Sequence, residues 1–145
     1  THLALSDPNY YDDNRFKERL LRLVREHRPV VVLDLHASAT TRPYTVDFGT
    51  MGGTSLKGRP DLLRDLARFL KKEGLRNFSQ DYFAASKQET VTSWVAEKTD
   101  APSIQLEINA AYLLDVDSPH IEMHRFAQLL QGMVRFIRKV GVEQP

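Results

Sequence analysis

Two residues of types that take part in catalysis interrupt an apolar run near the start of the chain. Residues 30–36 are β-branched or leucine except for Asp34 and His36. Such a run predicts a strand buried on both faces, in which these two residues point to the same side at its carboxyl end. Because ligand sites of open α/β sheets lie there, the pair is a candidate site. The alternative is a strand end whose polar groups simply reach water.

A second segment, residues 103–109, alternates polar and apolar side chains. As a strand it would place Gln105, Glu107 and Asn109 on one side and only isoleucine and leucine on the other. A carboxylate between two amides is a second candidate for chemistry. The alternative is an edge strand whose polar side faces solvent.

Two further patterns are weaker. The glycines within residues 49–55 could turn backbone N–H groups toward an anion, but the spacing to Lys57 does not match a P-loop, which favours a plain turn. His120 and His124 are four residues apart, a spacing that lets two imidazoles share a metal. No His-Glu-x-x-His motif accompanies them, which favours a solvated first helical turn.

Composition narrows the class of protein. The 145 residues are 41% hydrophobic and 27% charged, which is typical of one globular domain. A net charge of +1 predicts no nucleic-acid or membrane partner, and the absence of a spanning segment or signal sequence predicts a cytoplasmic protein. Because the chain has no cysteine, any transition metal must be held by His and carboxylate groups.

The rest of the chain must position the two candidate strands, residues 30–36 and 103–109. In it, stretches with apolar residues at helical spacing alternate with short apolar runs. The patterns predict helices at about residues 13–28, 60–74, 90–99 and 119–141, and further strands at 44–48 and 77–83. Asp13 is the predicted cap of the first helix. The sequence therefore predicts a single α/β domain over residues 1–145, with a mixed sheet flanked by helices on both faces.

The order of these motifs resembles the second half of the N-formylglutamate amidohydrolase family. The resemblance covers about residues 16–113, and it is carried by Asp34-Leu-His36, the glycine-rich segment 47–55 and Gln105-Leu-Glu107-Ile-Asn109. That family is similar to the zinc carboxypeptidases and to the succinylglutamate desuccinylase and aspartoacylase group. The resemblance implies a phosphorylase/hydrolase-like (zinc-peptidase-like) fold that is incomplete here, with this chain as the C-terminal part of a longer amidohydrolase domain.

The resemblance also implies a zinc-dependent amidohydrolase. His36 corresponds to the third zinc ligand, Glu107 to the general base, and Asp34 to a residue that orients a ligand. Zinc lowers the pKa of water toward about 7 and polarises the carbonyl of the scissile amide. Glu107 would take the proton from the water and return it to the leaving amine.

The implied substrate is a small, linear amide that bears a carboxylate. Arg42, in the loop after the first strand, is positioned to pair with that carboxylate. Gln105 and Asn109 flank the general base and are the other predicted substrate-binding residues.

The chain also departs from the family, because the two further zinc ligands come from an upstream His-x-x-Glu-like motif. The only histidines among residues 1–29 are His2 and His27, and neither belongs to such a motif. The chain is therefore expected to be either the C-terminal part of a longer enzyme or a protein that cannot run the reaction as it stands. The second case is a catalytically incomplete α/β domain that acts in binding or assembly. A nucleotide-binding module is a third alternative that rests only on residues 49–55.

A truncated sheet would also expose an apolar face and an open edge, which predicts a homo-oligomer.

Overall fold

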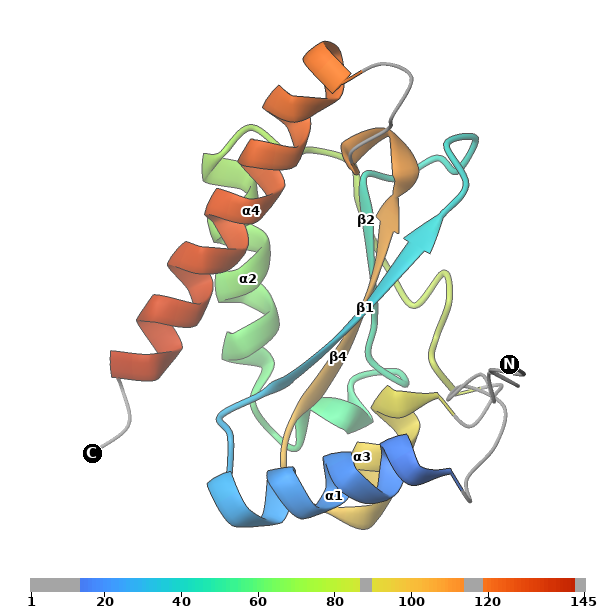
Figure 1. Cartoon of the computed structure of the whole chain (residues 1–145), viewed down its shortest axis with the longest axis vertical. Coiled ribbons are helices and arrows are strands. Elements are labelled where there is room, and N and C mark those ends of the chain that lie inside the picture. The colour runs from blue at the N-terminus through green and yellow to red at the C-terminus, as the bar shows by residue number, and fades with distance from the viewer. Residues whose placement is uncertain (1–13, 87–89, 114–118, 143–145) are drawn as a thin grey trace, which may run out of the picture.

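A computed structural model describes residues 14–86, 90–113 and 119–142, with side chains in the last range described from Met123 onward (Figure 1). Within these residues, four helices and four strands form the framework, together with two short 3₁₀ turns, η1 and η2. In chain order the elements are α1 (Arg15–His27), β1 (Val32–Ser38), β2 (Val46–Gly49), η1 (Thr54–Leu56), α2 (Pro60–Lys72), β3 (Phe78–Gln80), α3 (Val91–Lys98), β4 (Ser103–Asn109), η2 (Ala110–Tyr112) and α4 (Pro119–Val142).

The four strands form one mixed sheet in the order β1-β4-β2-β3. β1 runs parallel to β4, β2 runs antiparallel to β4, and β3 runs parallel to β2. Since β1 and β4 are far apart in sequence and parallel, the connection between them must cross over, and it contains β2, β3 and two helices. The predicted α/β class with a mixed sheet is confirmed.

The predicted burial of β1 is wrong. β1 does not lie in the middle of the sheet but at its edge, and Leu35 is 53% exposed. The central position belongs to β4, which lies between β1 and β2 and is buried along nearly its whole length. The alternative of residues 103–109 as a solvent-facing edge strand is therefore excluded.

Helices cover both faces of the sheet, as predicted. Ile104, Leu106 and Ile108 of β4 belong to the core cluster that is completed by leucines of α2 and by Leu129 and Phe136 of α4. α3 packs against β1 and β4, and α1 packs against α3 (Figure 1). None of the described helices is long and apolar enough to cross a bilayer.

The start of α1 differs from its prediction by one residue. Asn14, not Asp13, caps the helix, because its side-chain Oδ1 accepts a hydrogen bond from the backbone N of Lys17 at 2.8 Å. Asp13 itself lies outside the described residues.

Residues 49–55 form a closed turn. The backbone N–H groups of Gly53 and Ser55 both donate to the carbonyl oxygen of Thr50, at 2.9 and 3.1 Å. The segment then enters η1, a single short 3₁₀ turn. Because these N–H groups are used within the turn, the structure gives the nucleotide-binding alternative no phosphate cradle.

Close packing of α4 on α2 depends on Gly132. A Cβ atom at this position would lie 2.8 Å from Leu70 Cδ2 and 3.0 Å from Leu70 Cα, so the helices would have to move apart. We expect Gly132→Ala to lower the free energy of unfolding by about 2 kcal/mol in urea denaturation. Gly141→Ala is the matched control, because nothing lies within 4 Å of its Cβ, and it is expected to raise stability by up to about 1 kcal/mol. Equal effects of the two substitutions would contradict this account of the helix contact.

Candidate active site

The sheet brings the two polar motifs into adjacent rows on one face. In the β1–β4 register, Asp34 pairs with Gln105, His36 with Glu107 and Ser38 with Asn109. Register partners on neighbouring strands point to the same face, so the imidazole and the carboxylate lie side by side on the sheet. Asp47 of β2 is the antiparallel partner of Glu107 and extends the row to a third strand.

Asp34 ties His36 to the start of α3. Its Oδ1 lies 2.9 Å from His36 Nε2, and its Oδ2 accepts hydrogen bonds from Thr92 N at 3.2 Å and Thr92 Oγ1 at 3.3 Å. Asp34 is only 9% exposed, so it is not a strand end that simply reaches water. Because a carboxylate only accepts, the bond fixes a proton on His36 Nε2 and fixes the orientation of the ring.

Glu107 is half-buried and lines a cavity of about 450 Å³. Gln105 Nε2 donates to Glu107 Oε1 at 2.6 Å, which orients the carboxylate. The other cavity residues are Asp81, Tyr82, Phe83, Ala84, Ala85 and Thr90. A partly buried carboxylate in a cavity with aromatic walls is suited to proton transfer on a small bound molecule.

The segment that forms the aromatic wall is held by Asp47, a residue that sequence reasoning did not single out. Asp47 is fully buried and accepts hydrogen bonds from the backbone N atoms of Tyr82 at 3.2 Å and Phe83 at 2.8 Å. Asp81 in turn accepts from Thr50 N at 2.6 Å. The signal in the sequence was a single acidic residue within an otherwise apolar short strand.

Tyr44 is a second residue that was missed as part of the site. Burial raises the pKa of its phenol above the ordinary value, and the nearby carboxylates of Glu107 and Asp47 add to this shift. The phenol is protonated at neutral pH, so its O–H group is available to donate a hydrogen bond beside the polar rows.

The predicted substrate-binding residues lie around the row, and their roles stay predictions. Arg42 stacks on the aromatic wall, with Cζ 5.0 Å from the ring centroid of Phe83 and 5.7 Å from that of Tyr82. Asn109 Nδ2 donates to the carbonyl oxygens of three residues of the loop after β1, Thr40, Arg42 and Tyr44. The amide group of Asn109 therefore holds the loop that carries Arg42.

The described residues do not make a zinc site by themselves. No group of three or more His, Asp or Glu side chains within the described ranges is arranged to hold a metal ion. His36 fits the role of one imidazole ligand. His27 is exposed on α1, 3.9 Å from Glu26, and His124 is exposed on α4, whereas His2 and the side chain of His120 lie outside the description.

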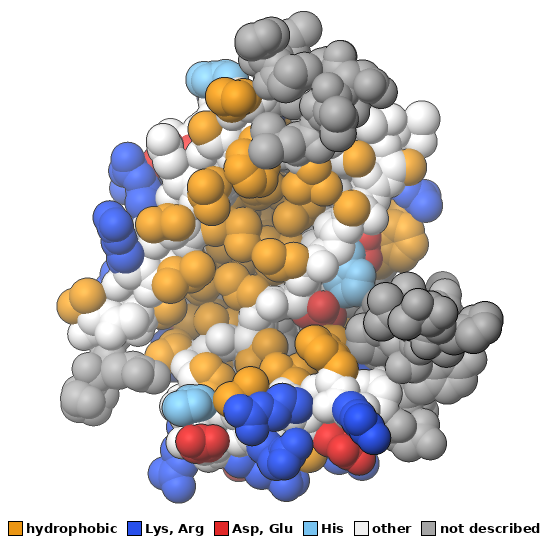
Figure 2. All heavy atoms as spheres, viewed as in Figure 1, with side chains coloured by type: hydrophobic (Ala, Val, Ile, Leu, Met, Phe, Trp, Pro, Cys, Tyr) orange, Lys and Arg blue, Asp and Glu red, His pale blue; other side chains and the backbone are white. Residues whose placement is uncertain are grey.

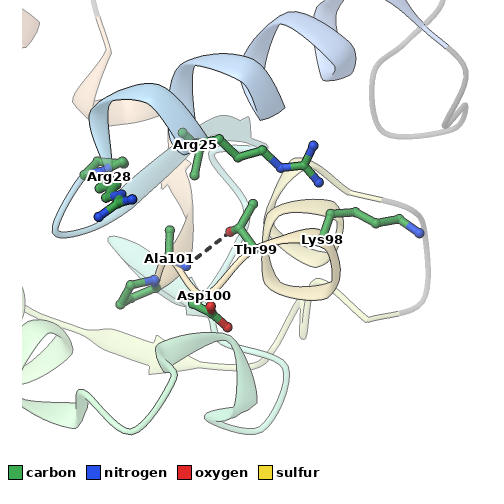
Figure 3. Close-up of a pocket in the computed structure, with 9 residues that line it drawn as sticks. Arg25, Arg28, Lys98, Thr99, Asp100 and Ala101 are labelled. Carbon is green, nitrogen blue, oxygen red and sulfur yellow. Dashed lines mark hydrogen bonds between the residues drawn. The ribbon is translucent and has the colours of Figure 1, made fainter.

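Another cavity, of about 670 Å³, lies away from this site, where α1 and α3 end (Figure 3). Arg25, Arg28 and Lys98 line it together with Asp100, and in Figure 3 the side chains of Arg25 and Lys98 extend away from Asp100. Both helices direct their C-terminal carbonyl groups to this end, which favours basic residues there and disfavours an anion. The basic residues are thus accounted for as helix-terminal charges.

Comparisons with known proteins give a remote structural match. No family model matches the sequence, and neither does any curated protein. The fold is similar to the crystal structure of N-formylglutamate amidohydrolase from Ralstonia eutropha JMP134, with a TM-score of 0.61 and 15% sequence identity over 88% of this chain. The match covers 50% of the other chain, so this chain spans about half the length of that structure. At this identity the likeness concerns the fold.

Proposed function

We propose that this chain belongs to a metal-dependent hydrolase that cleaves a small, linear amide bearing a carboxylate, as the name N-formylglutamate amidohydrolase describes for the structural neighbour. The observation that carries the proposal is the pairing of His36 with Glu107 in one row of the sheet. Asp34 orients the imidazole of His36 through the contact with its Nε2 atom, and the cavity at Glu107 has room for a small substrate.

Each residue has a distinct part in this proposal. His36 would be one ligand of a zinc ion, which, when bound, supplies an electrophile for the amide carbonyl and lowers the pKa of water. Glu107 accepts a proton from the attacking water and donates it to the leaving nitrogen. Arg42 pairs with the substrate carboxylate, Gln105 orients the base, and Asn109 contributes to substrate binding by holding the loop that carries Arg42. The remaining zinc ligands must come from residues beyond those that the structure describes, in keeping with a chain that is the C-terminal part of a longer domain.

Metal content tests the proposal directly. We expect the longer protein, purified with the residues that supply the remaining ligands, to bind zinc, measured by inductively coupled plasma mass spectrometry, and to hydrolyse N-formylglutamate. His36→Ala is expected to remove most of the zinc, because an imidazole ligand is lost. The control is His27→Ala, since His27 lies exposed on α1. Equal zinc contents of the two variants would contradict the assignment of His36.

A second candidate is a catalytically incomplete α/β domain that acts in binding or assembly. It is favoured by the lack of a three-residue metal cluster among the described residues. Absence of zinc and of hydrolytic activity in the longer protein would support this candidate and would contradict the hydrolase.

A further inference from the structure

The aromatic wall of the cavity, Tyr82 and Phe83, lies in an irregular segment that is nevertheless held tightly. Asp47 accepts from their two backbone N atoms with one carboxylate oxygen each. Backbone hydrogen bonds of 3.0 and 2.9 Å tie the two ends of residues 81–84 to β2 and to the turn after it. A Cβ atom on Gly49 would lie only 2.6 Å from the carbonyl oxygen of Phe83, so the segment lies directly against β2. The wall is therefore expected to keep one shape before any ligand binds.

The exposure of the wall is not explained by packing of the core. Tyr82 is 53% exposed, although its backbone is bonded to a fully buried carboxylate. Figure 2 shows hydrophobic side chains gathered in an apolar hollow between α4 and β1. Tyr82 does not belong to this hollow, because it lines the cavity of Glu107 on the other face of the sheet. A fixed backbone beneath an exposed ring is typical of a binding surface.

Arg42 is the cation that the two rings contact. Its Cζ lies 5.0 Å from the ring centroid of Phe83 and 5.7 Å from that of Tyr82, and the side chain is half-buried. Among the described residues the guanidinium has no hydrogen bond and no ion pair. Contact with the face of a ring uses none of its five N–H donors, so they are available to a ligand. An arginine held by aromatic rings, with no acidic partner, is suited to bind a carboxylate through two N–H groups.

Tyr44 connects this arginine with the polar rows. Its ring meets that of Tyr82 edge-on, with the centroids 5.4 Å apart. Burial is the main cause that raises the pKa of its phenol, and the charge of Glu107 raises it further whereas the charge of Arg42 lowers it. Both charged groups therefore lie near the same phenol. A single positive charge beside carboxylates favours a singly charged ligand group, such as a carboxylate, over a phosphate dianion.

We propose that Tyr82 and Phe83 are positioning residues that determine specificity, because they hold the guanidinium of Arg42 ready for the carboxylate of the substrate. The inference rests on the proposed function for the identity of the substrate and adds the origin of its selectivity. Because the rings order the long arginine side chain beforehand, less rotamer entropy is lost when the carboxylate binds. The wall thus acts on binding and not on proton transfer by Glu107.

Steady-state kinetics of the longer protein with N-formylglutamate separates binding from chemistry. Tyr82→Leu is expected to raise KM about 3- to 10-fold and to leave kcat within about twofold, because only the hold on Arg42 is lost. Tyr82→Phe keeps the face of a ring and should have the KM of the unsubstituted protein. Phe69→Leu is the matched control, since Phe69 contacts the guanidinium of Arg68 at 5.2 Å on α2, and it should not change KM.

Binding of glutarate to the same protein, measured by isothermal titration calorimetry, tests the wall without hydrolysis. Arg42→Ala should weaken binding at least about 10-fold, because charge-assisted hydrogen bonds are lost. Tyr82→Leu should weaken it about 3- to 10-fold. The double variant should bind no more weakly than Arg42→Ala alone, since the ring acts through the arginine. Glutaramide, which is neutral, should not distinguish Arg42→Ala from the unsubstituted protein.

Three results would overturn the proposal. The first is that glutarate does not bind, and the second is that it binds to Tyr82→Leu or to Arg42→Ala as tightly as to the unsubstituted protein. The third is an equal loss from Tyr82→Leu with and without Arg42, since the ring would then contact the ligand itself. Circular dichroism verifies that the variants fold. A protein that shows the expected binding pattern but no hydrolysis would support the role of the wall and contradict the proposed hydrolase, so the two failures are distinguishable.

Discussion

Glu107→Gln is expected to lower kcat for the hydrolysis of N-formylglutamate about 1000-fold, which is typical of the loss of a general base. The substitution keeps the shape of the side chain and keeps an oxygen that accepts the hydrogen bond from Gln105 Nε2. It removes only the ability to take up a proton from water. The free energy of unfolding and the zinc content should therefore stay close to those of the unsubstituted protein, while steady-state kinetics shows the loss in kcat.

The matched control for this experiment is Glu97→Gln, because Glu97 is an exposed glutamate on α3. It makes the same chemical change at a position outside the polar rows, and kcat should not change. If Glu107→Gln retained full activity with zinc bound, Glu107 would not be the base. If the variant lost zinc together with activity, the carboxylate would hold the metal instead.

The fold class could be predicted from local patterns, whereas the position of each strand in the sheet could not. The apolar run before Asp34 predicted a strand, but an edge strand that borders an apolar hollow has the same composition as a central one. Leu35 is exposed because of which strands lie beside β1, and that depends on pairing with residues about 70 positions away. The alternation around Glu107 likewise predicted a strand and its two faces, but not that β4 lies at the centre.

In the candidate site, too, local spacing could be predicted from the sequence, whereas contacts between distant segments could not. The two-residue spacing of Asp34 and His36 predicted that they share a side, and their 2.9 Å contact agrees. Asp47 was not predicted because its partners, the backbone N atoms of Tyr82 and Phe83, lie about 36 residues further along the chain. A hydrogen bond between a side chain and the backbone of a distant segment produces no repeating pattern of residue types in the sequence. The role of Glu107 came from the resemblance to a family, and its pairing with His36 came from the register.

The bond network of Asp34 joins the edge strand to a helix, and its removal is expected to be costly. Asp34→Ala would leave His36 Nε2 without its carboxylate, and it would leave the N and Oγ1 atoms of fully buried Thr92 without an acceptor. Each unsatisfied buried group costs about 1–3 kcal/mol, so we expect the free energy of unfolding in urea to fall by about 3 kcal/mol. Zinc affinity should fall 10- to 100-fold, because the ring of His36 is no longer held.

Asp61→Ala is the control for this prediction, since Asp61 also accepts from a neighbouring side chain but its pair with Arg59 is exposed. An exposed ion pair contributes at most about 1 kcal/mol, so this substitution should leave stability almost unchanged. Asp34→Asn should fall between the two, because the amide oxygen can still accept from Thr92, whereas its NH2 group can bond His36 Nε2 only if the imidazole changes to the other tautomer. If all three variants unfolded at the same urea concentration as the unsubstituted protein, the link between β1 and α3 would carry no stability, and the orientation of His36 would need another cause.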